Sequence, residues 1–396
     1  MSSANASVRL VQLDLLRGVA ILLVLLRHPL VDPHETGLLL PLAGVIHHLS
    51  WTGVDLFFVL SGFLVGGLLF DELRRHSRLD VTRFIIRRGF KIWPPYFVYL
   101  FLVYFILVFE DPEHHWGRAL SSLTPNLLHL QNYLGSPRAH TWSLAVEEHF
   151  YLLLPFLLKW CFPTRLAPSA SRKRLLLTAA LVLSSCLLFR LTVNLARPFQ
   201  ETTHYFPTHI RVDSMFFGVL LAYFYQHGVI TLEWAAQRRA RLLAIGLVLI
   251  SPMAVFGLRH PFAWTVGYTL LYLGYGAILL GVLGTPVGQG PLGRFFTSAP
   301  ARALAWLGYF SYSIYLWHMD VVPEIGRWLL LQVFGTAQPE LRYVVGVMLY
   351  VPAAALMGAG AAKLVEGPSL KLRDRWFPSR ARGIQGVGAK DSPGTS

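Results

Sequence analysis

The sequence predicts an all-helical integral membrane protein, built as a bundle of about ten transmembrane helices. Of its 396 residues, 54% are hydrophobic and 14% are charged, and the mean hydropathy is +0.49. A soluble domain of this size does not need so much apolar surface. Apolar windows of nearly the roughly 20 residues that one crossing requires recur at 13–31, 51–70, 92–109, 142–160, 175–193, 210–226, 242–258, 264–284, 303–321 and 343–363. The sixth window is short enough to be re-entrant.

Basic residues orient the predicted bundle with both termini in the cytoplasm. On this assignment the cytoplasmic segments contain the runs of Lys and Arg at 74–91 and 159–174, whereas the outer loop at 32–50 contains neither residue. This asymmetry follows the positive-inside rule. The net charge of +14 then lies mostly at the cytoplasmic face. A nucleic-acid partner is disfavoured because the basic residues flank helices instead of lining one folded face.

The first apolar window contains two costly polar side chains, Arg17 and His28. Eleven positions turn a helix by roughly 1100°, about 20° net, and advance it by about 16 Å. Both side chains therefore point from one face, one near each edge of the hydrocarbon, where ionisable groups are functional candidates. Asp14 and Arg17 interrupt the apolar run, and no small-residue cleavage site follows. We expect this helix to be retained and not cleaved as a signal peptide.

Several polar residues of later helices share a depth with His28. At about 1.5 Å per residue, each lies within about 10 Å of the outer boundary of the predicted bundle. This convergence predicts one polar site in the outer half of the bundle. The residues are Asp55, Glu147, Glu148, Arg211, Asp213 and His318.

A second set of residues lies at the cytoplasmic ends of the first and third predicted helices. Guanidinium groups bind phosphate oxygens in a two-pronged manner, and an aromatic ring can cover an adenine. The set therefore fits a phosphate-bearing donor. Alternatively, the basic residues are ordinary cytoplasmic anchors beside an interfacial tryptophan. The residues are Arg17, Arg87, Arg88, Lys91 and Trp93.

Several motifs occur in a fixed order along the chain. Arg17 and His28 form a pair of a basic residue and a histidine with a ten-residue gap between them. Five blocks follow this pair: GVDLFFVLSGFL, RRGFKIWPPY, TWSLAVEEHFYLLLP, RVDSMFFG and YSIYLWH. In this pair and in the order of these blocks, the chain resembles the acyltransferase-3 family of bacterial membrane O-acyltransferases. The sequence departs from the usual pattern at Lys91, where arginine is usual, at His149, where glutamine is common, and at Leu15, where glycine is frequent.

The resemblance covers about residues 10–370. It implies an acyltransferase transmembrane domain over residues 1–370, and we expect residues 371–396 to form a basic, disordered cytoplasmic tail. It also implies an enzyme of the bacterial inner membrane that takes an acyl group, in the first instance acetyl, from cytoplasmic acetyl-CoA or another acyl-CoA. The implied acceptor is a hydroxyl of a glycan or lipid-linked sugar at the outer face. No metal is expected, since no third ligand accompanies the tandem histidines His47 and His48 at a recognisable spacing.

In the expected mechanism His28 is the general base, because imidazole titrates near neutral pH and can take the proton of the acceptor hydroxyl. Asp55 would orient the imidazole, and Arg17 forms the central pair with His28. The oxyanion would be stabilised by Arg211 or Ser61. The residues expected to bind the acceptor or to support the site are Trp142, Glu147, Asp213 and His318.

Simpler interpretations of several residues stay open, as does a covalent acyl-histidine intermediate. The interpretations are a structural pair between Glu147 and Arg211, an interfacial belt formed by His318 and Trp317, close helix packing at Ser61 and Gly62, and a solvated outer loop around His47 and His48.

Two other classes of protein also fit buried Arg, Asp, Glu and His in ten helices. A proton-coupled transporter would use them as relay groups, although no halved repeat is evident. A receptor or scaffold would not depend on His28, and so many costly buried charges count against it.

Overall fold

The computed structural model describes residues 10–30, 40–111, 113, 115–335 and 337–380. Within these residues the regular elements are all helices and no strand forms, as the sequence predicts. The longer helices are α1 (Val11–Arg27), α3 (Gly53–His76), α4 (Val81–Glu110), α7 (Trp142–Cys161), α8 (Pro168–Ala196), α10 (Val212–Gln226), α11 (Leu232–Ile250), α13 (Tyr268–Leu283) and α18 (Pro339–Ala361).

Short helices connect and cap the long ones. They are α2 (Leu40–Ser50), α5 (Trp116–Leu127), α6 (Gln131–Leu134), α9 (Glu201–His204), α12 (Pro252–Val255), α14 (Gly290–Phe295), α15 (Ala299–Tyr309), α16 (Ser311–Trp317), α17 (Val321–Phe334) and α19 (Gly367–Trp376). Two 3₁₀ turns, η2 (Ala139–Thr141) and η3 (Thr208–Ile210), and two π-helical turns, η4 (Ala263–Gly267) and η5 (Ala362–Glu366), complete the fold.

Helices lie in all ten predicted apolar windows. Among the described residues, five segments are long and apolar enough to cross a membrane: Gly44–His76, Val81–Glu110, Pro168–Ala196, Ala263–Leu283 and Pro339–Trp376. The helices in the other windows are shorter or more polar, and the window at 303–321 is divided into α15 and α16 at Phe310. The total of ten crossings and the position of the termini therefore stay predictions.

Two predicted connections differ from the structure. The expected solvated loop around His47 and His48 is wrong, because both residues belong to α2 and are half-buried. His47 Nε2 lies 2.5 Å from Arg27 Nη1, and His48 Nδ1 lies 3.2 Å from the Ala254 carbonyl. The expected disordered tail also differs in part, since residues 371–376 belong to α19, which continues to Trp376. The boundary of the domain at residue 370 stays a prediction. Residues 381–396 of the expected tail lie outside the described part of the chain.

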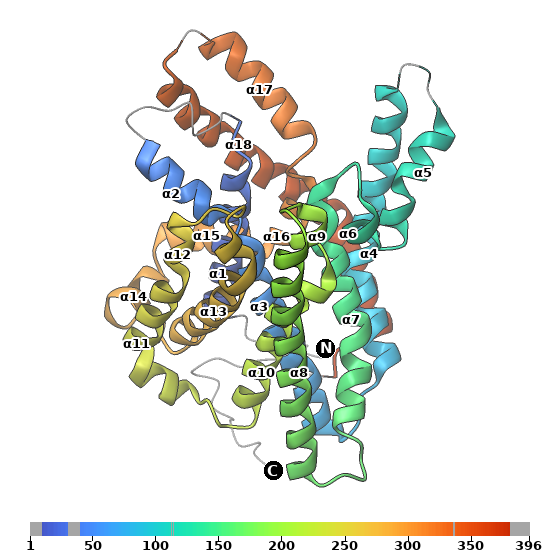
Figure 1. The fold of residues 1–396 in the computed structure, drawn as a ribbon, viewed down its shortest axis with the longest axis vertical. Coiled ribbons are helices and arrows are strands. Elements are labelled where there is room, and N and C mark those ends of the chain that lie inside the picture. The colour runs from blue at the N-terminus through green and yellow to red at the C-terminus, as the bar shows by residue number, and fades with distance from the viewer. Residues whose placement is uncertain (1–9, 31–39, 112, 114, 336, 381–396) are drawn as a thin grey trace, which may run out of the picture.

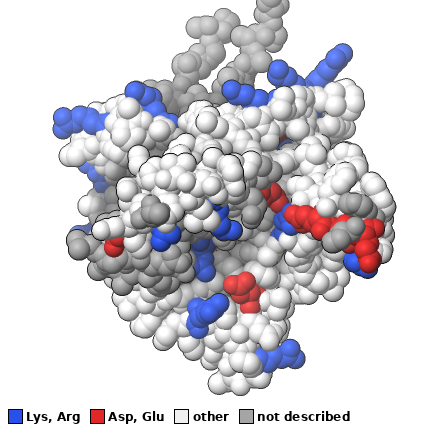
Figure 2. All heavy atoms as spheres, turned by 90° about the horizontal axis from the view of Figure 1, so that it is seen from above, with Lys and Arg blue, Asp and Glu red and all other residues white. Residues whose placement is uncertain are grey.

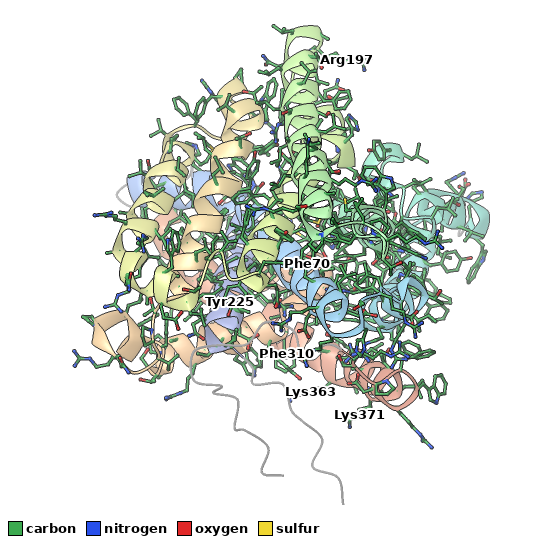
Figure 3. All side chains as sticks on the ribbon, turned by 90° about the horizontal axis from the view of Figure 1, so that it is seen from below. Phe70, Arg197, Tyr225, Phe310, Lys363 and Lys371 are labelled. Carbon is green, nitrogen blue, oxygen red and sulfur yellow. The ribbon has the colours of Figure 1, made fainter. Side chains whose placement is uncertain are left out.

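The bundle has two distinct ends. Helices α2, α5 and α17 gather at one end, and the connection between α7 and α8 lies at the other (Figure 1). Seen from the α2 and α5 end, charged side chains are scattered over a mostly uncharged surface (Figure 2). Seen from the opposite end, Lys363 and Lys371 lie at the edge where α19 packs on α4 (Figure 3). In the predicted orientation the first end faces outward and the second faces the cytoplasm.

Glycines allow α3 and α10 to approach closely. A Cβ atom added to Gly62 would lie 1.9 Å from the Met215 carbonyl oxygen, and one added to Gly218 would lie 2.3 Å from the Val59 carbonyl oxygen. Small residues commonly permit such contacts between membrane helices. Helix α3 is thereby held against α10 along its buried face, which fixes the walls of the pockets described next.

We predict that Gly62→Ala destabilises the protein by about 1–3 kcal/mol, because the added methyl group must displace backbone in an already close contact. The thermal midpoint of the detergent-solubilised protein, followed by size-exclusion chromatography after heating, measures this effect. Gly360→Ala in α18 is the matched control, since nothing lies within 4 Å of its added Cβ. Equal midpoints for the two variants would contradict the proposed packing.

Candidate active site

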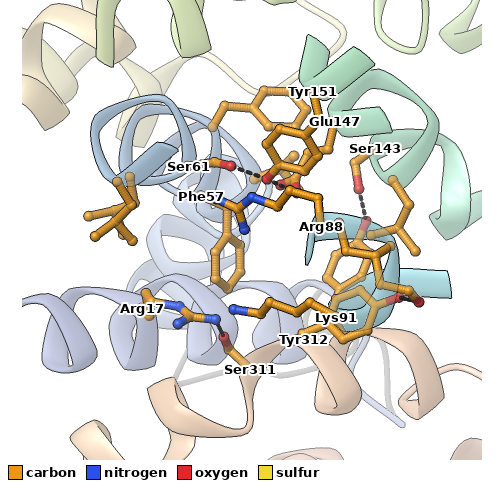
Figure 4. A pocket seen from close by; sticks show the side chains of 17 residues that line it. Arg17, Phe57, Ser61, Arg88, Lys91, Ser143, Glu147, Tyr151, Ser311 and Tyr312 are labelled. Carbon is orange, nitrogen blue, oxygen red and sulfur yellow. Dashed lines mark hydrogen bonds between the residues drawn. The ribbon is translucent and has the colours of Figure 1, made fainter. Parts of the chain in front are cut away.

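A central pocket collects basic side chains from two helices around one carboxylate. Its unfilled space is about 760 Å³, and its polar walls include Arg17 of α1, Arg88 and Lys91 of α4, and Glu147 of α7. The side chains of Arg17 and Lys91 point toward each other (Figure 4). Arg17 Nη2 donates to Ser311 Oγ at 3.0 Å. These like charges in one half-buried pocket create an environment that favours an anion.

Arg88 and Lys91 lack a hydrogen-bonding partner among the described residues. Within the described part of the chain, no hydrogen bond or ion pair reaches Arg88 or Lys91, although the Arg88 guanidinium lies 4.8 Å from the centroid of the Tyr151 ring. Cations held in a membrane protein ordinarily pair with a carboxylate, a carbonyl or a ligand. Arg88 and Lys91 are therefore available to an anionic ligand.

A short hydrogen-bonded chain lines the opposite wall of the central pocket. The Tyr151 hydroxyl donates to Glu147 Oε2 at 2.7 Å, so its oxygen accepts the hydrogen bond of Ser61. Deeper in the pocket, the Tyr315 hydroxyl donates to the His140 carbonyl at 2.6 Å and accepts from Ser143 at 2.6 Å. These bonds fix both tyrosines as rigid walls.

A second pocket, toward the α2 and α5 end, contains three histidines. Its unfilled space is about 700 Å³, and its lining includes His28, His140 and His318. The ring centroids of His28 and His318 are 5.5 Å apart, and those of His140 and His318 are 5.3 Å apart. We call this space the histidine pocket.

The tautomer of His318 follows from its contacts. Nδ1 lies 2.7 Å from the Tyr315 carbonyl and must donate to it, because a carbonyl only accepts. In the neutral ring Nε2 then has a free lone pair, and this buried atom has no hydrogen-bond partner among the described residues. Such an unsatisfied buried acceptor is costly and is suited to receiving a hydrogen bond from a bound hydroxyl.

Aromatic side chains form one wall of the histidine pocket. Trp142 stacks on Phe206 with ring centroids 5.3 Å apart and an interplanar angle of 21°. Trp51 and Tyr205 extend this apolar wall, and Arg27 contributes a charge to the same lining. The wall offers flat apolar faces beside polar groups, an arrangement that suits an amphipathic organic ligand.

The pockets adjoin one another in a row. Val54 and Tyr315 line both the central pocket and the histidine pocket. Arg88 and Lys91 line both the central pocket and a third, basic pocket at the α19 end, which has about 740 Å³ of unfilled space. A row of spaces thus runs from a basic mouth, past Arg17, to His28.

Asp55 and Arg211 lie outside this row, in a buried ion-pair cluster. Arg211 Nη2 is 2.9 Å from Asp55 Oδ1, and both side chains are 0% exposed. Arg190 Nη2 is 2.8 Å from Asp213 Oδ2, and the Arg211 guanidinium lies 3.9 Å from the centroid of the Tyr268 ring. The cluster joins α3, α8, α10 and α13.

This cluster corrects three expectations. Asp55 binds Arg211 and not His28, so it does not orient the imidazole. Arg211 pairs with Asp55 and Glu147 accepts from Tyr151, so the structure brings Arg211 neither to Glu147 nor into the lining of either pocket. Asp213 likewise binds Arg190 and supports the fold. The prediction grouped these residues because they have similar depths in the membrane. Their side chains point from their helices in different directions.

Further expectations also need correction. The prediction of one polar site in the outer half of the bundle is wrong. Glu147 lies in the central pocket with Arg17, whereas His28 and His318 lie in the histidine pocket. Trp93 does not line any of the three pockets, since its indole Nε1 donates to Glu148 Oε2 at 3.0 Å. Ser61 lines the central pocket, away from His28. Trp142 does lie in the histidine pocket.

Several residues of the site were missed by sequence reasoning. His140 immediately precedes the TWSLAVEEHF block, and Tyr315 stands inside YSIYLWH, so neighbouring motifs could have indicated both. Arg190 interrupts the apolar window at 175–193. A charge inside a membrane segment is costly, so this position could have been recognised as a candidate. Glu366 accepts a hydrogen bond from Ser313 at 2.9 Å at the end of η5, and no pattern in the sequence indicated it.

Comparison with known proteins identifies the class of the chain. Residues 10–362 match the family model described as "Acyltransferase domain". The chain therefore belongs to this acyltransferase family, as the resemblance implied.

Individual relatives carry the comparison further. The chain is 27% identical over 358 residues to the peptidoglycan O-acetyltransferase OatA of Listeria monocytogenes, covering 83% of this chain and 54% of that protein. It is 24% identical over 353 residues to the O-acetyltransferase OatA of Staphylococcus aureus, covering 83% and 55%. It is 28% identical over 319 residues to the putative peptidoglycan O-acetyltransferase YrhL of Bacillus subtilis, covering 71% and 46%. The chain spans about half the length of these relatives. No solved structure matches the chain significantly.

We predict that Asp55→Leu and Arg211→Met each destabilise the fold by about 3–5 kcal/mol, because each leaves a buried charge without its partner. The double variant should recover most of the loss, since two apolar side chains replace a complete pair. Thermal midpoints of the purified proteins measure both effects. Single variants with the midpoint of the unmodified protein would contradict the structural role of the pair.

Proposed function

We propose that the chain is a membrane O-acyltransferase that moves an acyl group, in the first instance acetyl, from cytoplasmic acyl-CoA to a hydroxyl of a glycan at the outer face of the bacterial cytoplasmic membrane. The observation that carries the proposal is the row of adjoining pockets from the basic mouth to His28. An elongated donor with a charged end and a reactive far end suits such a row.

The donor's phosphates belong at the basic end. Arg87, Arg88 and Lys91 line this end, and the absence of anionic partners for Arg88 and Lys91 among the described residues supports an anionic ligand there. Arginine binds phosphate oxygens through paired N–H donors. The pantetheine arm then passes Arg17 through the central pocket, and the thioester reaches the histidine pocket beside Val54 and Tyr315. Trp93 has no role in covering the adenine in this account.

His28 is the proposed general base of the transfer. It takes the proton of the acceptor hydroxyl as the hydroxyl oxygen attacks the thioester carbonyl. The new C–O ester bond forms, the C–S bond breaks, and the proton passes to the departing thiolate to give free CoA. His318 Nε2 holds the acceptor by receiving a hydrogen bond from a second hydroxyl. In this mechanism the two residues of the central pair have different roles: Arg17 binds the donor and His28 transfers the proton.

The aromatic wall supports a carbohydrate acceptor. The stacked rings of Trp142 and Phe206 offer a flat apolar face to the C–H face of a sugar ring, while His318 and Arg27 supply polar contacts. Two of the relatives are named for peptidoglycan. We therefore propose a cell-envelope glycan or a lipid-linked sugar as the acceptor.

The transporter alternative is not favoured by the family match. A row of pockets alone would suit either class, because a transporter also needs a path lined by polar groups. The distinguishing product is a new ester bond, which a transporter does not form.

We predict that His28→Ala lowers the rate of ester formation by 10²–10⁴-fold, the usual contribution of a general base. Membranes containing the protein are incubated with acetyl-labelled CoA and a host glycan extract, and base-labile label in the glycan is measured. His48→Ala is the matched control, because His48 is also half-buried but does not line the histidine pocket. The control should retain full activity.

Two results would overturn parts of this account. Absence of labelled ester with any tested acyl-CoA and varied hydroxyl acceptors, from a folded preparation, would remove the proposed function. Full activity of His28→Ala would keep the function and remove the proposed base.

A further inference from the structure

We propose that the C-terminal segment from Gly367 to Arg380 is part of the donor site, and that Arg373 and Arg380 bind the phosphate groups of a nucleotide thioester. The inference rests on the proposed acyl-CoA donor and extends it to residues beyond the matched family domain, which ends at residue 362. The chemistry recognised is a cluster of phosphate groups, as in the nucleotide end of CoA.

The basic pocket has walls from three helices. Helices α3 and α4 supply most of the lining, and the C-terminal segment closes the remaining side with Arg373, Ser379 and Arg380. Six basic side chains line this pocket against one carboxylate, Glu72. The basic residues are Arg83, Arg87, Arg88, Lys91, Arg373 and Arg380.

The C-terminal segment is docked on α4 through its own backbone. Arg83 donates to the Pro378 carbonyl and Arg87 donates to the Phe377 carbonyl. The Phe90 ring packs against Phe377 with centroids 6.2 Å apart, and the Ser369 hydroxyl donates to the Phe90 carbonyl at 2.5 Å. These contacts hold the segment across the mouth of the pocket.

The charge of the pocket is only partly balanced. Asp374 pairs with Arg87 at 3.3 Å and with Arg373 at 2.9 Å, and Asp80 pairs with Arg380 at 3.3 Å. The carbonyls that hold Arg83 and Arg87 are neutral acceptors and leave the positive charge in place. With Arg88 and Lys91 unpaired within the described residues, cations outnumber nearby carboxylates, and a ligand with several phosphate groups restores the balance.

The position of the pocket fits the same ligand. Arg88 and Lys91 also line the central pocket, so a nucleotide bound against Arg373 and Arg380 directs its thioester arm toward Arg17. A lipid phosphate headgroup shares this chemistry, but it has no arm that would enter the central pocket. The experiment must therefore separate CoA from an anionic lipid.

The test compares two donors on one double variant. We predict that Arg373→Gln with Arg380→Gln raises the KM for acetyl-CoA by about tenfold or more, the effect of losing charge-assisted hydrogen bonds, while kcat is retained. The KM for S-acetyl-pantetheine, which lacks the nucleotide and its pyrophosphate, should not change. Arg375→Gln is the matched control, because Arg375 lies on the same helix, is exposed and does not line the pocket.

A binding measurement completes the test without relying on turnover. Calorimetric titration of the solubilised protein with CoA, in detergent without anionic lipid, should show about tenfold weaker binding for the double variant and unchanged binding for Arg375→Gln. The unchanged use of S-acetyl-pantetheine shows that the double variant is folded.

Each contrary outcome has a definite meaning. Equal CoA affinity for the double variant and the unmodified protein would overturn the inference. Loss of phosphatidylglycerol binding with unchanged CoA affinity would assign the pocket to a lipid headgroup and overturn it as well. Absence of transfer from both donors by the unmodified protein would instead remove the proposed function, while the CoA titration would still decide the role of Arg373 and Arg380.

Discussion

The buried pair between Asp55 and Arg211 is the interaction on which the site depends. Both side chains are fully buried, so each charge is tolerable only because the other neutralises it. The neighbouring pair of Arg190 and Asp213 ties α8 into the same cluster. A buried pair of this kind adds little net stability compared with apolar side chains, but the loss of one partner leaves a buried charge unbalanced. Helix α3, fixed in this way by Asp55 and by the close contact at Gly62, supplies walls to all three pockets.

The pocket row and the ion-pair cluster differ in how their charges are balanced. In the cluster, each of the four charged side chains pairs with one of opposite sign. In the row, the side chains of Arg17 and Lys91 face each other, and among the described residues no ion pair reaches Arg88, whose guanidinium lies over the Tyr151 ring. Glu147 is the one carboxylate in the lining of the central pocket, so the positive charge is only partly balanced. In the proposed mechanism, the cost of gathering like charges in the unliganded protein becomes binding energy for a phosphate-bearing donor. At the other end, the unsatisfied Nε2 of His318 prepares the histidine pocket for a hydroxyl in the same way.

The sequence predicted the helical class and the helices in each apolar window because hydrophobic run length is a local property. The expected shared face of Arg17 and His28 stays a prediction, because α1 ends at Arg27 and His28 follows it as a non-helical cap residue. The two residues line adjoining pockets. The prediction from sequence was wrong where the neighbours of a side chain depend on the direction in which it points from its helix. Asp55, Glu147 and His318 have similar depths but point into the ion-pair cluster, the central pocket and the histidine pocket, respectively. Contacts between distant segments, such as Arg87 with Asp374, have no local signal at all.

The central claim is that the acyl group crosses most of the membrane through the pocket row while the nucleotide stays at the basic mouth. The most direct measurement uses sealed proteoliposomes with the glycan acceptor trapped inside, labelled acetyl-CoA added outside, and protein oriented with its basic end outward. The account predicts labelled ester inside the vesicles and all of the CoA outside. Ester that forms only when donor and acceptor are on the same side of the membrane would contradict it.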